Sequence, residues 1–452
     1  MGLPFKSYWL KSGLLTLMQR GSILLFGIGG FMILVRLLNK QDYGTWMLYI
    51  SIITIMEMIR NGFVRNSMVK FLAAAQDESD TKHILSASLL LHLGIVLLQT
   101  LFILGVSQFL PEFWSAPGLD DILYIAIPGL FFLLPFCHFE FVQQANLSFM
   151  GTFWSHFVRR GGLFFYILLA FLLDWEVTLV SLAWVQVITV LFGAIVGYVY
   201  TRRYTWFSTS YKHTWFTELF HYGKYTFGTN ISSMLTSNMD QWMLGRMISP
   251  AAVAIYSPAL RVANLVEVPT VSVSSIVFPQ VAKRIEEEGP GAAKRLYEKS
   301  VALILAIILP LSAIIFLLAE PVILILAGRE YLNTVPILQV TIFYSFFVPF
   351  ARQFGTVLDG MNMPKVNFYF VLLNAVLNAI FNYFFIKSYG VIGAAYGTLS
   401  SFIVAFILNQ IYLNRKLGVK LGRIVSEMFN FYFVGIRTGT GFIKARLIPR
   451  NS

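Results

Sequence analysis

Long apolar stretches, separated by short polar or Gly/Pro-rich breaks, run along most of this chain. Six lie in the first half, at about residues 13–38, 43–60, 83–107, 121–141, 154–173 and 177–200. Six more follow, at about residues 220–247, 251–278, 300–319, 333–358, 364–386 and 391–413. Each stretch is close to the length that a helix needs to cross a bilayer. The pattern predicts an all-α polytopic membrane protein with 12 transmembrane helices.

The composition supports a membrane protein and excludes an ordinary soluble one. Of 452 residues, 57% are hydrophobic and only 12% are charged, whereas a soluble protein carries about a quarter charged residues. The single cysteine, Cys137, excludes an internal disulfide and a cysteine-based zinc site. The N-terminal apolar segment has no small-residue cleavage site, so we expect it to remain as an uncleaved span.

Lys and Arg predict the orientation in the membrane. With the N-terminus placed in the cytoplasm, the loops on the opposite side hold only five of the 34 basic residues: Arg36, Lys40, Arg246, Arg329 and Lys387. Because basic loops remain in the cytoplasm, we expect both termini there and the protein in a bacterial inner membrane. The charge is dispersed over loops and a tail, so the net charge of +12 does not indicate nucleic-acid binding.

The basic tail, residues 414–452, contains an apolar stretch from Met428 to Ile436 that is too short to span a membrane. An apolar segment among Lys and Arg suits an interfacial position on anionic lipid. A tail that is simply solvated is the alternative.

The two halves of the chain show signs of an internal repeat. Arg36, Gly44 and Trp46 correspond to Arg246, Ala254 and Tyr256 at an offset of 210, and Leu134-Pro135-Phe136 corresponds to Val348-Pro349-Phe350 at an offset of 214. We therefore predict two six-helix lobes, residues 1–212 and 213–413, related as parallel repeats about the membrane normal. The same offsets align Glu57 with Glu267, and His138 with Arg352.

Ionisable side chains inside the predicted spans are the main functional signal. Apart from histidines we count seven: Arg20, Glu57, Glu140, Asp240, Arg261, Glu267 and Arg352. A charge at the centre of a bilayer costs about 2.5–3.5 kcal/mol when a helix inserts, so seven facing lipid would cost more than the net stability of a fold. Local pairs such as Glu57 with Arg60, or Asp240 with Arg246, are one explanation. An aqueous cavity between the two halves, used for transport, is the other.

Catalytic motifs are not recognisable. We find no phosphate-binding loop, no HExxH and no Ser or Cys nucleophile with identifiable partners, so neither an enzyme nor a metal site is expected. The charged segment Ala282 to Ser300 is interpreted as a solvated connector. An integral-membrane glycan polymerase or glycosyltransferase stays as an alternative, although its large hydrophilic loop with catalytic carboxylates is not recognisable.

Several motifs in both halves resemble those of a known family. They are Leu34-Val35-Arg36-Leu37-Leu38-Asn39-Lys40-Gln41-Asp42-Tyr43-Gly44-Thr45-Trp46, Asn61-Gly62-Phe63, Asp240-Gln241-Trp242-Met243-Leu244-Gly245-Arg246, Ala254-Ile255-Tyr256-Ser257, Phe278-Pro279 and Gly390-Val391-Ile392-Gly393-Ala394-Ala395-Tyr396-Gly397. In this order they resemble the polysaccharide transporter family, the Wzx-type flippases, within the superfamily of multidrug extruders and lipid II flippases.

The resemblance implies a MATE-like bundle of two lobes that moves a polyprenyl-pyrophosphate-linked oligosaccharide from the cytoplasmic to the outer leaflet by alternating access. It also implies a role in surface polysaccharides such as O-antigen, capsule or exopolysaccharide, with polysaccharide polymerase machinery as a partner. A cation-coupled multidrug extruder of the same superfamily is the alternative, and an acidic cavity would favour it.

Under this hypothesis the intramembrane residues divide by charge. Arg20, Arg261 and Arg352 are candidates for binding the pyrophosphate, because guanidinium stays charged and binds phosphate with two parallel bonds. His138 and Asn230 are further candidates for the substrate cavity. Candidates for binding a coupling proton or sodium ion are Glu57, Asp240, Glu267 and Glu140. No cofactor is expected.

Overall fold

The structure is a computed structural model that describes residues 5–75, 77–289, 291–361 and 363–433. Within these ranges it leaves undescribed the side chains of residues 5–17, 19, 20, 23, 222–236, 275, 276, 278–280, 282, 283, 285 and 286. All regular secondary structure in the described residues is helical. The chain divides into two compact units, Met1–Ala254 and Ile255–Ser452.

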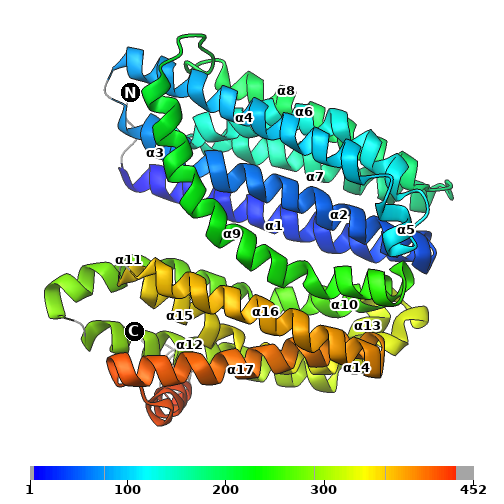
Figure 1. Ribbon diagram of the computed structural model, residues 1–452, viewed down its shortest axis with the longest axis vertical. Coiled ribbons are helices and arrows are strands. Elements are labelled where there is room, and N and C mark those ends of the chain that lie inside the picture. Colours follow the sequence, from blue (N-terminus) through cyan, green and yellow to red (C-terminus); the bar gives the residue numbers. More distant parts are fainter. Residues whose placement is uncertain (1–4, 76, 290, 362, 434–452) are drawn as a thin grey trace, which may run out of the picture. The chain divides into compact units, whose positions relative to one another are not determined.

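The first unit is a bundle of long helices (Figure 1). α6 packs against α4 and α8, α7 packs against α1 and α8, and α9 lies along α2, α4 and the π-helix η1. Its elements are α1 (Phe5–Leu37), α2 (Lys40–Arg60), η1 (Asn61–Arg65), α3 (Asn66–Ala74), α4 (Glu78–Val106), α5 (Leu110–Trp114), α6 (Leu119–Ala145), α7 (Phe149–Leu172), α8 (Leu179–Thr201) and α9 (His213–Met247).

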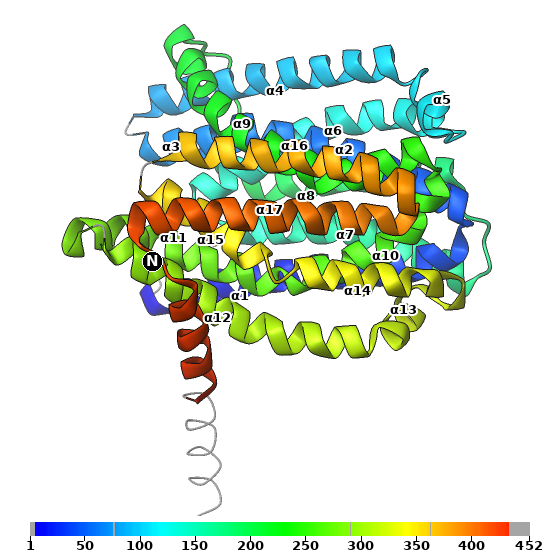
Figure 2. The ribbon, with the colours of Figure 1, turned by 60° about the horizontal axis from the view of Figure 1, so that its bottom comes forward.

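The second unit is also helical, and α10 leads into it from the first. Its α16 and α17 form an antiparallel hairpin, while α11 packs against α12 and α15. The elements are α10 (Pro250–Val266), α11 (Val268–Glu288), α12 (Gly291–Leu317), α13 (Ala319–Ala327), the 3₁₀-helix η2 (Arg329–Thr334), α14 (Val335–Tyr344), α15 (Val348–Gly360), α16 (Pro364–Tyr389) and α17 (Val391–Leu417). Residues 421–433 are helical as well and run across the direction of α17 in Figure 2.

Local sequence signals explain where several helices begin and end. The Asn39 side chain accepts a hydrogen bond from the Asp42 backbone N–H at 2.9 Å and caps α2. Thr178 and Ser181 form a reciprocal capping box at the start of α8. Gly418, with φ of 67°, follows the end of α17, in a left-handed conformation that glycine adopts without steric cost.

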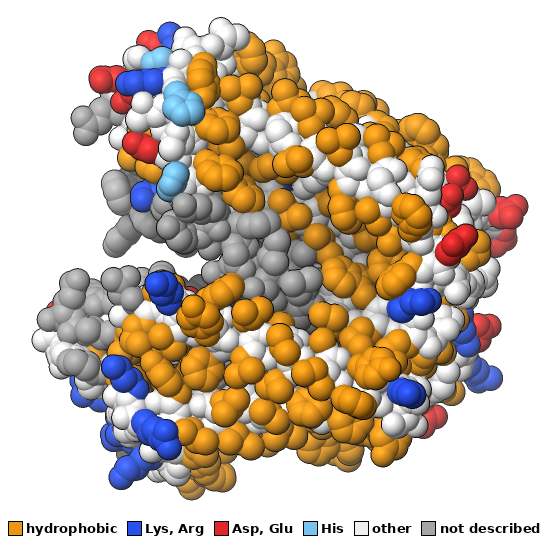
Figure 3. Space-filling model, viewed as in Figure 1, with side chains coloured by type: hydrophobic (Ala, Val, Ile, Leu, Met, Phe, Trp, Pro, Cys, Tyr) orange, Lys and Arg blue, Asp and Glu red, His pale blue; other side chains and the backbone are white. Residues whose placement is uncertain are grey.

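The described residues contain ten helices that are long and apolar enough to cross a membrane, and a shorter apolar helix, Leu24–Leu37. On the face seen in Figure 3, hydrophobic side chains cover the middle of each unit, and charged side chains gather toward the ends of its helices. The all-α polytopic fold is therefore confirmed. The count of 12 spans and the lobe boundaries at residues 212 and 413 stay predictions.

One detail of the predicted spans was wrong. Asn61-Gly62-Phe63 does not end the second span, because the helix continues through η1 into α3 as far as Ala74. The spans predicted at 251–278 and 333–358 each correspond to one candidate membrane span, Pro250–Ser274 and Arg329–Gly360, with a local helix break at Glu267 in the first and between Tyr344 and Val348 in the second. Pro269 and Pro349 stand just after these breaks, where a missing N–H is tolerated.

The segment Ala282 to Ser300 was also wrongly interpreted as a solvated connector. It consists mainly of the end of α11 and the start of α12, which meet near Gly289. Tyr297, Glu298 and Ser300 are buried on α12. Charge density alone could not reveal this burial, because the apolar partners come from helices distant in the sequence.

Candidate functional site

A buried ion pair links α2 to α7 in the first unit. The guanidinium of Arg159 donates a hydrogen bond to the carboxylate of Glu57, and their side chains are only 8% and 20% exposed. Arg159 lies ten residues after the first residue of α7, Phe149, which places it about 15 Å along the helix axis. Pairing removes much of the cost of burying either charge alone at this depth.

A small cavity of about 10 Å³ adjoins this ion pair, with room for about one water molecule. Tyr49 of α2 and Gln186 of α8 line it together with Glu57, Arg159 and apolar residues. The side-chain oxygen of Gln186 has no hydrogen-bond partner in the part of the chain that the structure describes. The ion pair thus adjoins a space suited to one small polar species.

A second carboxylate, Glu140 on α6, forms a related network nearer the ends of the helices. His156 Nε2 lies 3.2 Å from its Oε2 and Arg65 Nη2 lies 4.0 Å from its Oε1. Gln144 donates a hydrogen bond to Glu140 at 2.8 Å and accepts one from Arg65 at 3.2 Å. Arg159 is within electrostatic range of both Glu140 and Glu57, so the two networks are coupled.

Arg60 is a fully buried arginine on α2 that lacks a carboxylate hydrogen-bond partner among the described residues. Its Nη2 donates to the Gln99 side chain at 3.0 Å and to the Leu130 carbonyl at 3.3 Å. Its Nε and Nη1 have no hydrogen-bond partner within the described ranges. Arg60 directly precedes η1, and π-helices are frequent at functional sites. The sequence allowed a local Glu57–Arg60 pair as one explanation, but the direct partner of Glu57 is Arg159, and Arg60 acts on Glu57 at longer range.

In the second unit, two candidate residues lie at the two helix breaks. Glu267 stands between α10 and α11, and Arg352 is in the second turn of α15. Ala263, Tyr344 and Val348, which flank the two breaks, pack together in one apolar cluster. Glu267 and Arg352 are within electrostatic range of each other. Broken membrane helices commonly form ion and substrate sites.

Polar groups continue along the contact between α11 and α15. Gln353 Nε2 donates to Ser274 Oγ at 2.9 Å, and both side chains are buried. Thr270 Oγ1 and Gln353 Oε1 are buried acceptors without a hydrogen-bond partner among the described residues. Arg352 itself is exposed, while Arg261 on α10 is half-buried. This arrangement can bind an anion at Arg352 beside a carboxylate.

The remaining sequence candidates have mixed outcomes. His138 is buried, with Nε2 2.6 Å from the Trp206 carbonyl oxygen, and its ring lies 6.1 Å from that of His92. Asp240 on α9 is buried. The side chains of Arg20 and Asn230 lie outside those described. A shared cavity between the two halves remains a prediction.

The sequence analysis missed Arg159 as an intramembrane charge. The fifth span was expected to begin at about residue 154, yet Arg159 and Arg160 were counted with the cytoplasmic residues. The start of α7 at Phe149 places the pair well inside the helix. The available signal was an Arg-Arg pair inside an apolar run, because a charge there needs a partner from another span.

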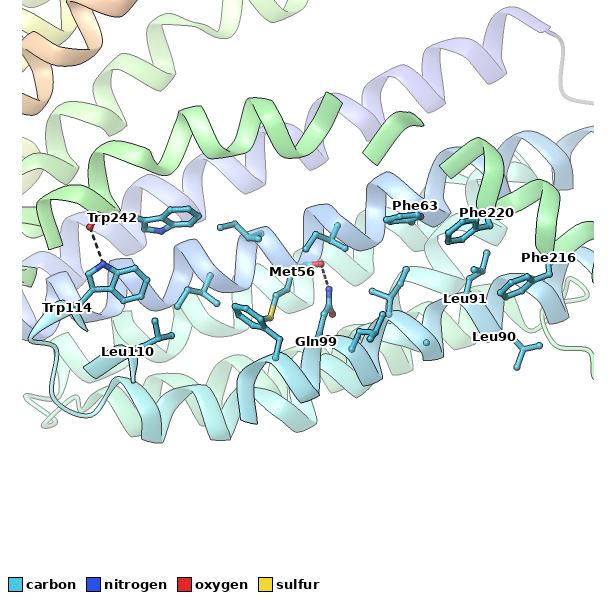
Figure 4. A pocket seen from close by; sticks show the side chains of 17 residues that line it. Met56, Phe63, Leu90, Leu91, Gln99, Leu110, Trp114, Phe216, Phe220 and Trp242 are labelled. Carbon is cyan, nitrogen blue, oxygen red and sulfur yellow. Dashed lines mark hydrogen bonds between the residues drawn. The ribbon is translucent and has the colours of Figure 1, made fainter. Parts of the chain in front are cut away.

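An apolar cavity of about 810 Å³ is the other notable feature of the first unit (Figure 4). Its walls come from α2, η1, α4, α5 and α9. At one end are Trp114 and Trp242, and at the other are Phe216 and Phe220. All of its lining residues belong to one unit.

Comparison with known proteins identifies the family of this chain. A family model described as "Polysaccharide biosynthesis protein" matches residues 33–336. The "Probable low-salt glycan biosynthesis flippase Agl15" of Haloferax volcanii is 25% identical over 202 residues, which are 45% of this chain and 43% of that protein. An uncharacterized membrane protein of Methanocaldococcus jannaschii is 28% identical over 200 residues, 44% of this chain and 39% of its own length. The chain thus spans about two fifths of these two relatives.

Solved structures show the same fold over most of the chain. An inward-facing multidrug resistance MATE family transporter of the MOP superfamily superimposes with a TM-score of 0.76 over 88% of this chain and 94% of its own, at 14% identity. The lipid II flippase MurJ, in an inward closed conformation, has a TM-score of 0.72 over 95% of this chain and 93% of its own, at 14% identity. The family resemblance of the sequence motifs is confirmed. The chain belongs to the polysaccharide biosynthesis protein family and has the fold of the MOP superfamily of transporters.

Proposed function

We propose that this protein flips a polyprenyl-pyrophosphate-linked oligosaccharide across the cell membrane by alternating access, for the synthesis of a surface polysaccharide. The substrate enters from the cytoplasmic leaflet and leaves in the outer leaflet, and both termini are cytoplasmic. Relatives named above are archaeal, so the proposal covers a bacterial or an archaeal cell membrane. The observation that carries the proposal is the family match over residues 33–336 of a chain with this transporter fold.

The polarity of the proposed substrate explains why charged side chains are needed inside the membrane. A pyrophosphate and many sugar hydroxyls cannot enter hydrocarbon without compensating contacts. We assign phosphate binding to Arg20, Arg261 and Arg352, with His138 and Asn230 as further contacts to the head group. The exposure of Arg352 and the half-burial of Arg261 support this assignment, because each can reach a ligand.

The carboxylates are assigned to ion coupling. Protonation of Glu57 would remove its attraction to Arg159 and would loosen the contact between α2 and α7. Glu140, Asp240 and Glu267 are further positions at which a proton or sodium ion could bind. Two charge states of one buried pair then correspond to two packings of the same helices, which is the requirement for coupling an ion to a conformational change.

We expect Arg261→Ala and Arg20→Ala each to lower flipping of a lipid-linked oligosaccharide by about tenfold or more, because a charge-assisted contact to phosphate is lost. The measurement is transport in proteoliposomes reconstituted with equal amounts of protein. Arg329→Ala, an exposed arginine at the start of η2, is the matched control and should retain activity. Full activity of both cavity variants would overturn the phosphate role.

The multidrug extruder alternative shares this fold. The same proteoliposomes distinguish it, since an extruder would export a cationic dye and leave the oligosaccharide lipid in place. The intramembrane candidates are mixed, four carboxylates and three arginines, which keeps this alternative, so the transport assay decides between the two functions.

The helix formed by residues 421–433 is attached firmly to the second unit. The buried carboxylate of Glu298 accepts a hydrogen bond from the Lys420 backbone N–H at 3.1 Å and lies 3.5 Å from Arg423 Nε. Ile424 and Met428 are buried in the apolar cluster around α12 and α15. These contacts fix the rotation of the helix about its own axis.

This fixed rotation leaves an apolar stripe outward: Leu421, Val425, Phe429 and Phe433, all exposed and four residues apart. Exposed Arg415, Lys416, Lys420 and Arg423 lie around the start of the helix. An apolar stripe beside basic side chains matches the boundary between head groups and acyl chains of an anionic leaflet. We assign this helix to that boundary.

We expect a nitroxide at Phe429→Cys to be more accessible to oxygen than to a water-soluble nickel complex when the protein is in anionic nanodiscs. The same label at Asn430→Cys, on the neighbouring polar side, should show the opposite order. Native Cys137 is buried and does not compete for labelling. A label at residue 429 that prefers the nickel complex would show a solvated tail.

A further inference from the structure

The apolar cavity of the first unit is a long groove. Its described lining residues on α9 are Phe216 and Phe220 near one end and Trp242 near the other, and Phe216 and Trp242 are 26 positions apart. At 1.5 Å per residue this is about 39 Å of helix, compared with about 30 Å for the hydrocarbon core of a bilayer. The length of the groove is therefore comparable with the thickness of the hydrocarbon core, and its two aromatic ends lie well apart in Figure 4.

The groove has a buried floor and an exposed rim. Met56, Leu91 and Trp114 of the floor are buried, whereas Leu98 and Phe102 of the rim are 68% and 53% exposed. It is thus open along its side to whatever surrounds the protein. In a membrane, its contents can exchange with lipid.

The polar atoms of the floor are turned into the protein. Gln99 donates to the Met56 carbonyl at 2.8 Å and accepts from Arg60 at 3.0 Å. Trp114 Nε1 donates to the Trp242 carbonyl at 3.1 Å, and Trp242 Nε1 donates to Ser51 Oγ at 3.0 Å. The surface that faces the groove is therefore hydrocarbon, and it selects an apolar ligand.

Shape decides which apolar ligand fits. A volume of about 810 Å³ spread over a length of about 39 Å leaves a mean cross-section near 20 Å². A helix of about 10 Å diameter is too wide for this space, whereas one hydrocarbon chain fits. A phospholipid acyl chain reaches only through its own leaflet, so it would fill about half of the length. A long isoprenoid chain can follow all of it.

We propose that this groove binds the polyprenyl chain of the transported lipid, a proposal that rests on the function proposed above. The chain stays in hydrocarbon on α2, α4 and α9 while the charged head group crosses elsewhere. Because the groove is about as long as the hydrocarbon core is thick, the chain slides along one apolar surface throughout the crossing. The length of the carrier chain, as well as the sugar, is then a determinant of specificity.

Gly94 allows a direct test. It lines the groove on α4, and a Cβ added there meets no atom within 4 Å. The first atom of a new side chain therefore enters open space, so Gly94→Phe is chosen to place a ring in the groove, and it removes a glycine from a helix interior, which does not destabilise the helix. Leu97→Phe is the matched control, because it places the same side chain three residues further along α4, on an exposed position that does not line the groove.

The first assay is photo-crosslinking of full-length protein in nanodiscs with undecaprenyl phosphate that carries a diazirine at the far end of its chain. We expect labelling of the groove in the wild type and in Leu97→Phe, and about tenfold less in Gly94→Phe. Equal labelling of all three proteins overturns the proposal. The proposal is also overturned if excess ordinary phospholipid abolishes the labelling, since the groove would then be a site for acyl chains.

The second assay compares flipping of one saccharide diphosphate carried on an undecaprenyl or on a farnesyl chain. We expect Gly94→Phe to lose about tenfold for the long carrier and to match the wild type for the short one. If the variant flips both as the wild type does, the groove assignment is wrong and the function stands. If the wild type flips neither, the proposed function is wrong, and the cross-linking result alone decides whether the groove binds the chain.

Discussion

Replacing Arg159 by methionine is expected to destabilise the protein by about 3–5 kcal/mol, because it leaves the Glu57 carboxylate buried without its partner. The two side chains are only 8% and 20% exposed, so water cannot fully replace the lost ion pair. The measurement is unfolding in mixed micelles of increasing denaturing detergent. This is the largest effect that we expect of a single substitution.

The double variant Glu57→Gln with Arg159→Met is the control. Removing both charges leaves no uncompensated carboxylate, so stability should return to within about 1 kcal/mol of the wild type. If Glu57 carries the coupling ion, this folded variant should still fail to couple flipping to an ion gradient. A single Arg159→Met variant as stable as the wild type would show that Glu57 is already neutral in the fold.

Replacing Gly393 by alanine is expected to cost at least about 2 kcal/mol, through overpacking of the α16–α17 hairpin. A Cβ at Gly393 would lie 2.1 Å from the Phe385 carbonyl oxygen, and one at Gly397 would lie 2.8 Å from the Asn382 Cα. Both obstacles are backbone atoms, which cannot move aside as the tip of a side chain can. Thermal unfolding and the yield of monodisperse protein are the measurements.

Gly105→Ala is the matched control in another membrane helix. A Cβ there meets no atom within 4 Å, so the change should be neutral or should stabilise α4 by up to about 1 kcal/mol. If Gly393→Ala were equally harmless, close approach of the two helices would not explain the glycines in the segment Gly390 to Gly397.

The breaks in the spans illustrate what apolar patterning misses. Glu267 and the residues between Tyr344 and Val348 interrupt helices that looked continuous, because a proline inside a membrane helix is compatible with either a kink or a full break. Pro128 and Pro135 lie inside an uninterrupted α6. Which outcome occurs depends on the neighbours that satisfy the freed backbone groups, and those neighbours come from distant parts of the chain.

At the candidate site, the sequence likewise predicted which residues are buried charges but not which residues they contact. Glu57 and Glu140 were identified as buried carboxylates from their positions in apolar runs, because a charge there is costly whatever the fold. Glu57 pairs with Arg159 of α7, and Glu140 pairs with His156 of α7 and Arg65 of η1. Arg159 and Arg65 each lie far along the chain from the carboxylate that they contact. Sequence spacing suggested Arg60 for Glu57, whereas its direct partner is Arg159.

The sequence alone determined the all-helical polytopic architecture, the family and the presence of costly intramembrane charges. These follow from the amount and period of apolar residues and from motifs that lie close together in the chain. Only the tertiary structure decided which charges pair, where helices break and that α2, α4 and α9 line one long apolar groove. Each of these depends on helix rotation and packing between distant segments, since a hydrophobic pattern in lipid specifies that a helix is buried but not which side faces a neighbour.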